Sequence, residues 1–231
     1  MANIIDPSRH LAVFDPRSFN DRVDIIGAGA TGSYLALGLA KLGVEHIRVI
    51  DGDVVAEHNI ANQCFEQCHI GQAKVAALAD VIKRATGCEI DTVMGFAPGD
   101  VEKPWAPYVF LLTDTMASRK TIMADIEAEL DTRCVIETRM GADLARVYVV
   151  NPAMPSEVER WSSTLVSDDD AEASPCGATT TVGPTVYTLA GIALWQFIRY
   201  HGWSLDASKF ERPEHELIYG LNPFSYVSTK W

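Results

Sequence analysis

The stretch VDIIGAGATG, residues 23–32, decides the fold class of this 231-residue chain. It begins with four residues typical of a buried strand and leads into a segment, residues 31–42, with apolar side chains at helical spacing. Gly27, Gly29 and Gly32 stand between the two, in the G-x-G-x-x-G arrangement of a strand-to-helix turn. Glycine there allows a tight turn and lets phosphate oxygens approach backbone N–H groups at the positive end of the helix. The pattern favours nucleotide binding, with a tight turn that holds no ligand as the alternative.

Strand and helix patterns alternate along the whole chain. Further strands are predicted at 46–50, 89–95, 109–113, 134–137 and 147–150, and further helices at 74–86, 119–130 and 186–200. This alternation predicts an α/β protein with a doubly wound, mostly parallel, Rossmann-like sheet, helices on both faces and a small C-terminal strand extension. We expect one domain over residues 1–231, with an N-terminal arm at 1–20 and a flexible crossover loop at 160–176.

Composition and charge restrict the function classes. The 19 basic and 31 acidic residues give a net charge of −12 without a Lys/Arg cluster, which disfavours a nucleic-acid partner. The longest apolar region, residues 187–198, is shorter than the about 20 residues of a membrane span. The first residues lack the pattern of a signal peptide, and the five cysteines contain no CxxC pair. We therefore expect a cytoplasmic protein with no membrane contact and no structural zinc.

A carboxylate closes the second predicted strand. Asp51 stands 19 residues beyond Gly32, which is the usual place for a carboxylate that accepts hydrogen bonds from both ribose hydroxyls. A simple turn residue at the strand end is the alternative. Up to this point the chain suits a nicotinamide-dependent oxidoreductase as well as any other nucleotide enzyme.

A polar run follows Asp51 and extends through Asp53, Asn59 and Gln63 to Lys74. Dinucleotide enzymes have no need of such a run. A nucleoside triphosphate does need one, because its β- and γ-phosphates must be held by donors and cations while a nucleophile attacks the α-phosphorus. The run therefore favours triphosphate chemistry over hydride transfer.

These segments resemble a known family. DGDVVAEHNIANQ at residues 51–63 and GQAK at residues 71–74 are similar to motifs of the E1-like adenylyltransferases, which include the ThiF and MoeB enzymes and the ubiquitin-activating enzymes. The resemblance covers about residues 9–200. It implies an enzyme that uses ATP and Mg²⁺ to adenylate the C-terminal carboxylate of a small ubiquitin-like or sulfur-carrier protein.

The resemblance also implies roles for individual residues. Gly27, Gly29 and Gly32 would cradle the nucleotide, Asp51 would hold the ribose with Asp53 close by, and Asn59, Gln63 and Lys74 would contact the phosphates, Lys74 with a catalytic part.

Two further matches and one departure concern catalysis. Asp114, at the end of a predicted strand, matches the magnesium-binding aspartate of the family's Asp-x-x-x-x-Arg segment. Arg9 resembles an arginine that reaches the neighbouring subunit's ATP site in several members, which implies a homodimer. Asn62 stands where the family usually has arginine, so one cation for the leaving pyrophosphate is missing. Either Arg9, Lys74 or another cation compensates, or the activity is weaker or altered.

Cys176 and Arg139 each have two interpretations. Cys176 precedes Gly183-Pro184 with a spacing similar to that of the catalytic cysteine in ThiF-like members, whose thiolate would attack the acyl adenylate. The alternative is a small buried residue under the crossover loop. Arg139 follows a predicted strand and faces either the ligand crevice or a structural ion pair.

Three functions remain open from the sequence. The first is an ATP-dependent adenylyltransferase, with or without later transfer to Cys176. The second is an NAD(P)-dependent oxidoreductase, for which no constellation of proton-donating residues is recognisable. The third is a non-catalytic nucleotide-binding scaffold of the same fold, to which Asn62 would be suited. A tRNA-modifying relative conflicts with the net charge of −12.

Overall fold

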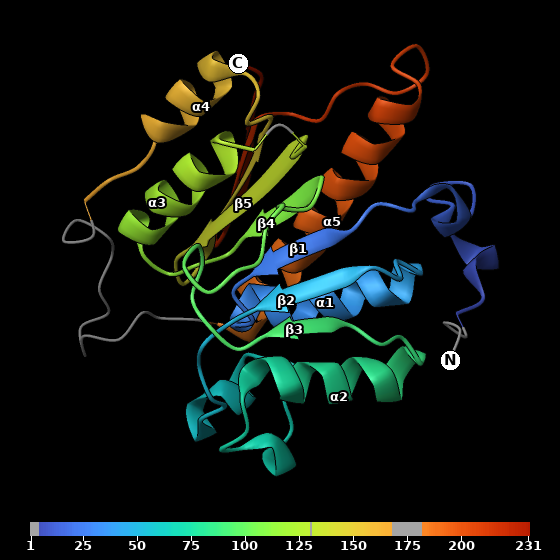
Figure 1. Ribbon diagram of the computed structural model, residues 1–231. Coiled ribbons are helices and arrows are strands. Elements are labelled where there is room, and N and C mark those ends of the chain that lie inside the picture. Colours follow the sequence, from blue (N-terminus) through green and yellow to red (C-terminus); the bar gives the residue numbers. More distant parts are fainter. Residues whose placement is uncertain (1–4, 130, 168–181) are drawn as a thin grey trace.

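The described residues form one eight-stranded sheet (Figure 1). The computed structural model describes residues 5–129, 131–167 and 182–231. The strands, in the spatial order β3-β2-β1-β4-β5-β6-β7-β8, are β1 (Val23–Ile26), β2 (Ile47–Ile50), β3 (Asp91–Val93), β4 (Tyr108–Leu111), β5 (Cys134–Met140), β6 (Leu144–Val150), β7 (Glu216–Leu221) and β8 (Phe224–Thr229). The five strands from β3 to β5 are parallel to one another, which confirms the expected Rossmann-like sheet.

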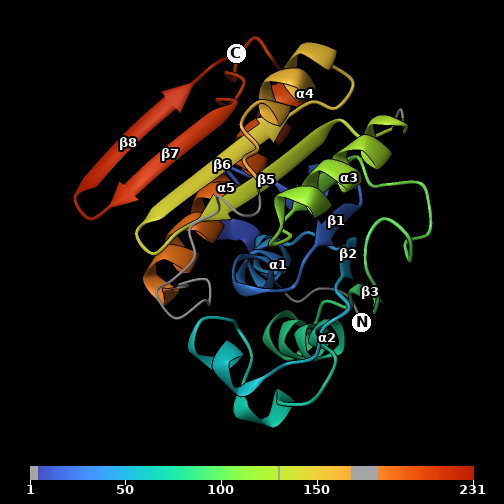
Figure 2. The ribbon, with the colours of Figure 1, turned by 90° about the vertical axis from the view of Figure 1, so that its left-hand side faces the viewer.

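Helices cover both faces of this sheet (Figure 2). They are α1 (Ala30–Leu42), α2 (Lys74–Thr86), α3 (Met116–Glu127), α4 (Pro155–Ser162) and α5 (Gly183–Leu205), with short 3₁₀ turns η1 (Pro7–Arg9), η2 (Pro16–Ser18), η3 (Glu57–Ala61) and η4 (Gln67–His69). Helices α1, α2 and α5 pack against one face, and α3 and α4 pack against the other. The doubly wound arrangement follows from right-handed crossovers between parallel strands.

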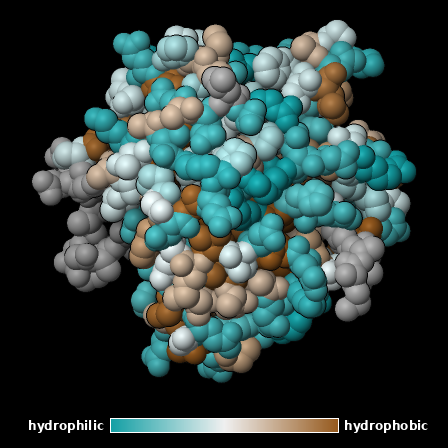
Figure 3. Space-filling model, viewed as in Figure 1, coloured by the Kyte–Doolittle hydropathy of each residue, from teal (hydrophilic) through white to brown (hydrophobic). Residues whose placement is uncertain are grey.

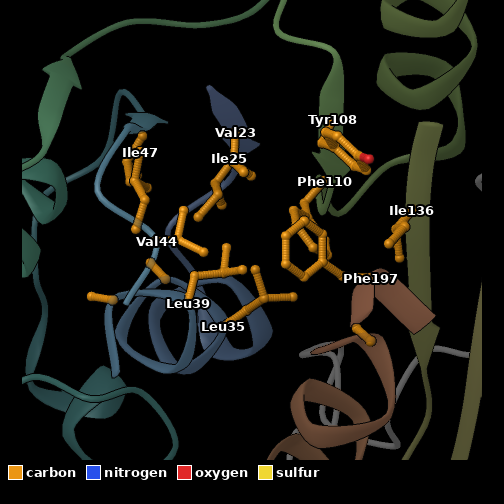
Figure 4. Close-up of a cluster of buried hydrophobic side chains, with 14 of the residues drawn as sticks. Val23, Ile25, Leu35, Leu39, Val44, Ile47, Tyr108, Phe110, Ile136 and Phe197 are labelled. Carbon is orange, nitrogen blue, oxygen red and sulfur yellow. The ribbon is translucent and has the colours of Figure 1, made fainter. Parts of the chain in front are cut away.

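Apolar side chains of the strands make the core on both faces. On the first face, Val23 and Ile25 of β1 lie with Leu35 of α1, Phe110 of β4 and Phe197 of α5 (Figure 4), and all five are fully buried. The side of the molecular surface that Figure 3 shows is largely hydrophilic, with hydrophobic areas between the hydrophilic ones. Burial of large side chains on both faces holds the parallel strands and their turns in place.

Local signals define the ends of the first two helices. Helix α1 ends at Gly43 with φ +92° and α2 ends at Gly87 with φ +76°, the left-handed conformation that glycine adopts without strain. Each of these glycines directly follows a segment that the sequence predicts as helical, residues 31–42 and residues 74–86.

The alternation of strands and helices breaks down after β5. Strand β6 turns back through residues 141–143 and pairs antiparallel with β5, and β7 and β8 continue the antiparallel pairing. The expectation of alternation throughout is therefore wrong in this half, although the β7–β8 hairpin confirms the predicted C-terminal strand extension. The expected domain division of the chain is not tested by these strands and stays a prediction.

Two segments differ from their predicted form. Helix α4 was not predicted, and because it ends at Ser162, the first residues of the expected loop 160–176 are helical. The rest of that loop from residue 168 lies outside the described residues. Two residues of the expected N-terminal arm pack into the core: Phe14 and Phe19 are 3% and 6% exposed and are in ring contact with Phe197. Among the described residues, no helix combines the length and apolar character needed to cross a membrane.

Candidate nucleotide-binding site

A cavity of about 300 Å³ opens at the carboxyl ends of β1, β2 and β4. This edge of a parallel sheet is where open α/β folds bind ligands, because strand order reverses there. Six predicted site residues line the cavity: Gly27 and Gly29 from the turn, Asp51 and Asp53 after β2, Lys74 from α2, and Asp114 after β4. The lining is completed by Ile26, Ile50, Gly52, Gly95, Phe96, Ala97, Leu112, Thr113, Ser118 and Ile122.

The three glycines of the turn have different physical tasks. Gly27 has φ +104°, and a Cβ there would lie 2.8 Å from the Leu112 carbonyl oxygen. A Cβ on Gly32 would lie 1.9 Å from the Gly27 carbonyl oxygen, so Gly32 permits the close contact between the turn and α1. A Cβ on Gly29 would meet nothing within 4 Å. Gly29 therefore borders open space, whereas Gly27 and Gly32 shape the turn.

Asp51 joins the glycine turn to the end of β2. Its Oδ2 accepts a hydrogen bond of 2.7 Å from the Ala28 N–H, and its Oδ1 accepts one of 2.8 Å from the Asp53 N–H. A carboxylate oxygen has two lone pairs, so each still has capacity for a ribose hydroxyl. The structural and the ligand-binding interpretations of Asp51 are thus compatible.

Lys74 is the cation of this cavity. It is the first residue of α2, and its Nζ donates a 2.7 Å hydrogen bond to Asp53 Oδ2. The Lys74 side chain is 10% exposed and that of Asp53 is 57% exposed. Among the described residues that line the cavity, Lys74 is the only one with a positive charge. The ion pair holds the ammonium group at the cavity wall while its exposed partner can be displaced by a ligand phosphate.

Asp114 is exposed and lies just before the first turn of α3. The helix is capped by Thr115, whose hydroxyl accepts the Ser118 N–H at 3.2 Å. Arg119, the arginine of the Asp-x-x-x-x-Arg segment, is buried and donates to Glu137 and to the Thr138 carbonyl. The arginine therefore anchors the segment to β5, and the aspartate stays at the cavity.

The lining suits a nucleoside triphosphate and a magnesium ion. Open space beside Gly29 at the start of α1, with Lys74 nearby, suits phosphates. Magnesium typically takes one or two carboxylates and completes its shell with substrate phosphates and water. The described residues contain no cluster of three or more metal-ligating side chains, and Asp53 is paired with Lys74. Asp114 is the carboxylate with which this donor set would hold the ion.

Three predicted phosphate- and nucleotide-binding residues do not line the cavity. The Asn59 side chain accepts the Ala56 N–H at 2.8 Å and caps η3. Gln63 is buried, its carbonyl accepts the Tyr34 hydroxyl at 3.2 Å, and its Oε1 has no hydrogen-bond partner among the described residues. Gly32 lies beneath the turn. Phosphate contacts by Asn59 and Gln63 therefore stay predictions.

The remaining predicted residues lie elsewhere. Arg9 is exposed and lines a separate cavity between η1, α1 and α5. Arg139 forms a structural ion pair, because its guanidinium donates to Glu137 at 2.9 Å and to the Thr164 carbonyl at 2.7 Å. Cys176 lies outside the described residues, so neither interpretation of it is tested. Cys88 and Cys134 are buried in the core.

Phe96 and Ser118 line the cavity but were missed by the sequence interpretation. Phe96 lies in an irregular segment after β3, where no periodic pattern points to a site. The available signal was positional: β3 ends at the same sheet edge as β1 and β2, and the residues that follow such strands face the ligand crevice.

The fold and this lining define a nucleotide-binding α/β protein, and comparison with known proteins identifies its family. A family model described as the ThiF family matches residues 14–222, and the chain therefore belongs to the ThiF family. The predicted E1-like resemblance is confirmed.

Curated relatives match over shorter stretches. The chain is 40% identical over 60 residues to "Adenylyltransferase and sulfurtransferase MOCS3-1" of Zea mays, covering 26% of this chain and 13% of that protein. It is 38% identical over 82 residues to "Probable adenylyltransferase/sulfurtransferase MoeZ" of Mycobacterium tuberculosis, covering 32% of this chain and 21% of that protein. The matched stretches thus span less than a quarter of the length of these relatives.

Solved structures share the fold over most of the chain. A crystal structure of PaaA superposes with a TM-score of 0.69 at 21% identity, covering 91% of this chain and 73% of that chain. A crystal structure of Escherichia coli MccB with ATP superposes with a TM-score of 0.67 at 15% identity, covering 91% and 64%. At these identities the likeness concerns the fold.

Proposed function

We propose that this chain is an ATP-dependent adenylyltransferase that activates the C-terminal carboxylate of a ubiquitin-like or sulfur-carrier protein. The observation that carries the proposal is one cavity that combines Gly29, Asp51, Lys74 and Asp114. Membership in the ThiF family and the adenylyltransferase names of the two relatives support it. A cytoplasmic location and a single adenylation domain are part of the same proposal.

The residues divide the work of binding a triphosphate. Asp51 accepts the ribose hydroxyls, and the phosphates run past Gly29 to the amino end of α1, where backbone N–H groups and the helix dipole favour anions. Lys74 gives up its hydrogen bond to Asp53 and binds a phosphate oxygen. Its positive charge then offsets the negative charge that grows on the pyrophosphate leaving group. Asp114 would hold Mg²⁺, which would neutralise phosphate charge when bound.

The reaction itself is a displacement at the α-phosphorus. An oxygen of the carrier carboxylate forms a bond to this phosphorus while the bond to the bridging oxygen of pyrophosphate breaks. The products are an acyl adenylate and pyrophosphate. The chain's part is to hold the two reactants in line and to stabilise the transition state. A later attack by Cys176 on the adenylate would follow this step and is not needed for it.

In a homodimer, the partner subunit would supply the cation that is missing because Asn62 stands where the family usually has arginine. Lys74 is the one positive charge among the described lining residues, and Arg9 is exposed in a different cavity. Arg9 therefore cannot serve the cavity of its own chain in this arrangement. Arg9 of the partner subunit would be available for the pyrophosphate if two chains associate, which is the arrangement that the family resemblance implies.

Carrier-dependent exchange of labelled pyrophosphate into ATP tests the proposal, with a small carrier protein that ends in Gly-Gly. We expect Lys74→Ala to reduce exchange by about a hundredfold or more, since loss of one transition-state donor has that effect. Lys83→Ala is the matched control, because Lys83 is on the same helix and pairs with Glu89 at the surface. Binding of a nicotinamide dinucleotide without any binding of ATP would refute the proposal.

A further inference from the structure

Phe96 is an exposed aromatic residue on the wall of the nucleotide cavity. The residue is 65% exposed, although phenylalanine is among the residue types most often buried. It follows β3 and lines the cavity together with Ala97. An exposed aromatic ring at a ligand cavity has an apolar face available for contact with the ligand.

The ring of Phe96 lies directly against Gly52. A Cβ on Gly52 would come within 2.5 Å of two ring carbons, Cε2 and Cζ. Gly52 is not among the glycines with positive φ, so its backbone conformation does not require glycine. The close approach of the Phe96 ring is therefore the physical reason for glycine at this position.

The backbone that carries Phe96 is held by its own loop. The Phe96 N–H donates a 2.8 Å hydrogen bond to Asp100 Oδ2, and the Asp100 N–H donates one of 3.1 Å to the Phe96 carbonyl. A Cβ on Gly95 would come within 2.5 Å of the Asp100 Cβ, so the turn is tightly closed. The exposed ring is thus presented from a fixed backbone.

Ribose on Asp51 would direct the two ends of a nucleotide apart. The phosphates would extend toward Gly29 and Lys74, and the base would extend away from them, toward the wall made by Phe96. The neighbouring lining residues Ile50 and Ala97 are apolar and offer side-chain contact without hydrogen bonds. This wall has the chemistry of a stacking surface, which accepts the flat face of an aromatic base.

We propose that Phe96 is the residue on which the base of the bound nucleotide stacks, and that Gly52 is a positioning residue that makes room for its ring. This rests on the proposed nucleotide function of the cavity and adds a binding residue to it. Stacking recognises the π-face rather than the hydrogen-bonding edge, so Phe96 contributes affinity for the base.

Titration calorimetry with ATP tests the role of the ring. We expect Phe96→Ala to raise the Kd for ATP about tenfold, in the range of stacking losses measured by alanine substitution. Phe96→Tyr keeps an aromatic face and should bind ATP nearly as the wild type does. Met94→Ala is the matched control, because Met94 is 62% exposed on the same segment and does not line the cavity. Thermal melting verifies that each variant is folded.

Inorganic tripolyphosphate separates stacking from a general disturbance of the cavity. This probe has the phosphates but no base, so its competition with ATP analogues should give the same inhibition constant for wild type and Phe96→Ala. If Phe96→Ala weakens tripolyphosphate and ATP by the same factor, Phe96 acts through the loop and the stacking proposal is wrong.

A double-mutant cycle tests Gly52. We expect Gly52→Ala alone to raise the Kd for ATP because its Cβ displaces the ring, and to add little in the Phe96→Ala background, where no ring remains. Additive effects of the two changes would contradict this coupling.

The outcomes separate the two proposals. If the wild type binds ATP and Phe96→Ala binds it equally well, the stacking role is refuted and the nucleotide function stands. If the wild type binds NAD⁺ but not ATP, the adenylyltransferase function is refuted, and the effect of Phe96→Ala on NAD⁺ decides the stacking role. A wild type that binds neither refutes both.

Discussion

Asp53 and Glu137 are carboxylates that each meet basic side chains near the carboxyl edge of the parallel strands. Asp53 pairs with one lysine and its side chain is 57% exposed. Glu137 lies opposite Leu111, where β4 ends, and is fully buried between Arg119 and Arg139. Trp161 Nε1 also donates to Glu137, at 3.1 Å. The chemistry of the two sites is similar, but their access to solvent is opposite.

This difference separates a ligand site from a structural one. The donors around Glu137 are used up by protein groups, and a ligand would have to displace buried bonds. The Asp53–Lys74 pair borders a cavity, and because its carboxylate is 57% exposed, a ligand phosphate can replace that carboxylate on the lysine at little cost to stability. The role of an ion pair at this end of the sheet therefore follows from how deeply it is buried and not from the types of residue that form it.

The largest effect is expected when Glu137 is removed from its buried cluster with Arg119 and Arg139. Glu137→Ala leaves two buried guanidinium groups without their carboxylate, which typically costs about 3–5 kcal/mol. For a chain of this size we expect the melting temperature to fall by roughly 10 °C, measured by calorimetry. Asp53→Ala is the matched control and should change the melting temperature by only a few degrees. Equal losses in the two variants would show that burial does not distinguish the two ion pairs.

The next largest effect concerns the glycine turn, in which one glycine supports the fold and another borders the ligand space. Gly32→Ala places its Cβ 1.9 Å from a backbone oxygen, so we expect it to destabilise the fold, by about 3 kcal/mol. Gly29→Ala meets no atom within 4 Å and should melt as the wild type does, while ATP binds about tenfold more weakly because the methyl group occupies the phosphate cradle. A Gly29→Ala variant with unchanged ATP affinity would show that the cradle is not used.

The smallest effect concerns a buried histidine far from the cavity. Burial among the rings of Phe14, Phe19 and Tyr108 lowers the pKa of His201, with Asp21 opposing and Arg133 reinforcing the shift. The unfolded chain therefore binds this proton more readily, at a pKa of about 6.5. Its contribution to stability is present above that pH and is lost as the pH falls toward the lowered pKa of the folded state.

His201→Gln should accordingly flatten the decline of the free energy of unfolding between about pH 6.5 and pH 5, measured by urea denaturation. The pKa of His215 is also lowered by burial and acts with the same sign. Because His215 stays in the variant, the difference between the two pH curves isolates His201. His46→Gln, at an exposed position, is the control; an identical change there would contradict the role of burial.

The sequence predicts the parallel half well because each signal there is local. The strand, the glycine turn, the helix and the closing glycine at position 43 follow one another within about twenty residues. Asp51 and Asp114 are far apart in the chain, yet their meeting was predictable, since both follow parallel strands whose carboxyl ends lie at one edge. Chain reversal at β6 was not predictable, because a short apolar run is equally suited to either direction.

The features of the site that the sequence left open or did not indicate have a related cause. Asn59 belongs to the matched motif, but its side chain caps η3 and lies outside the cavity lining. Arg139 could face the crevice or an ion pair, and only the position of Glu137 and Thr164 decides between them. Phe96 belongs to an irregular segment in which no spacing indicates a role. Each of these depends on contacts between residues distant in the chain.

By itself, the sequence determined the strand–turn–helix unit, the glycine conformations that end α1 and α2, and the membership in the ThiF family that its motifs indicate. These follow from backbone sterics and short-range periodicity, which act between near neighbours. The tertiary structure alone decided the antiparallel half of the sheet, the burial of Glu137 against the exposure of Asp53, and the approach of the Phe96 ring to Gly52. The reason is that burial is a property of packed elements, and packing is set by which distant segments share a face.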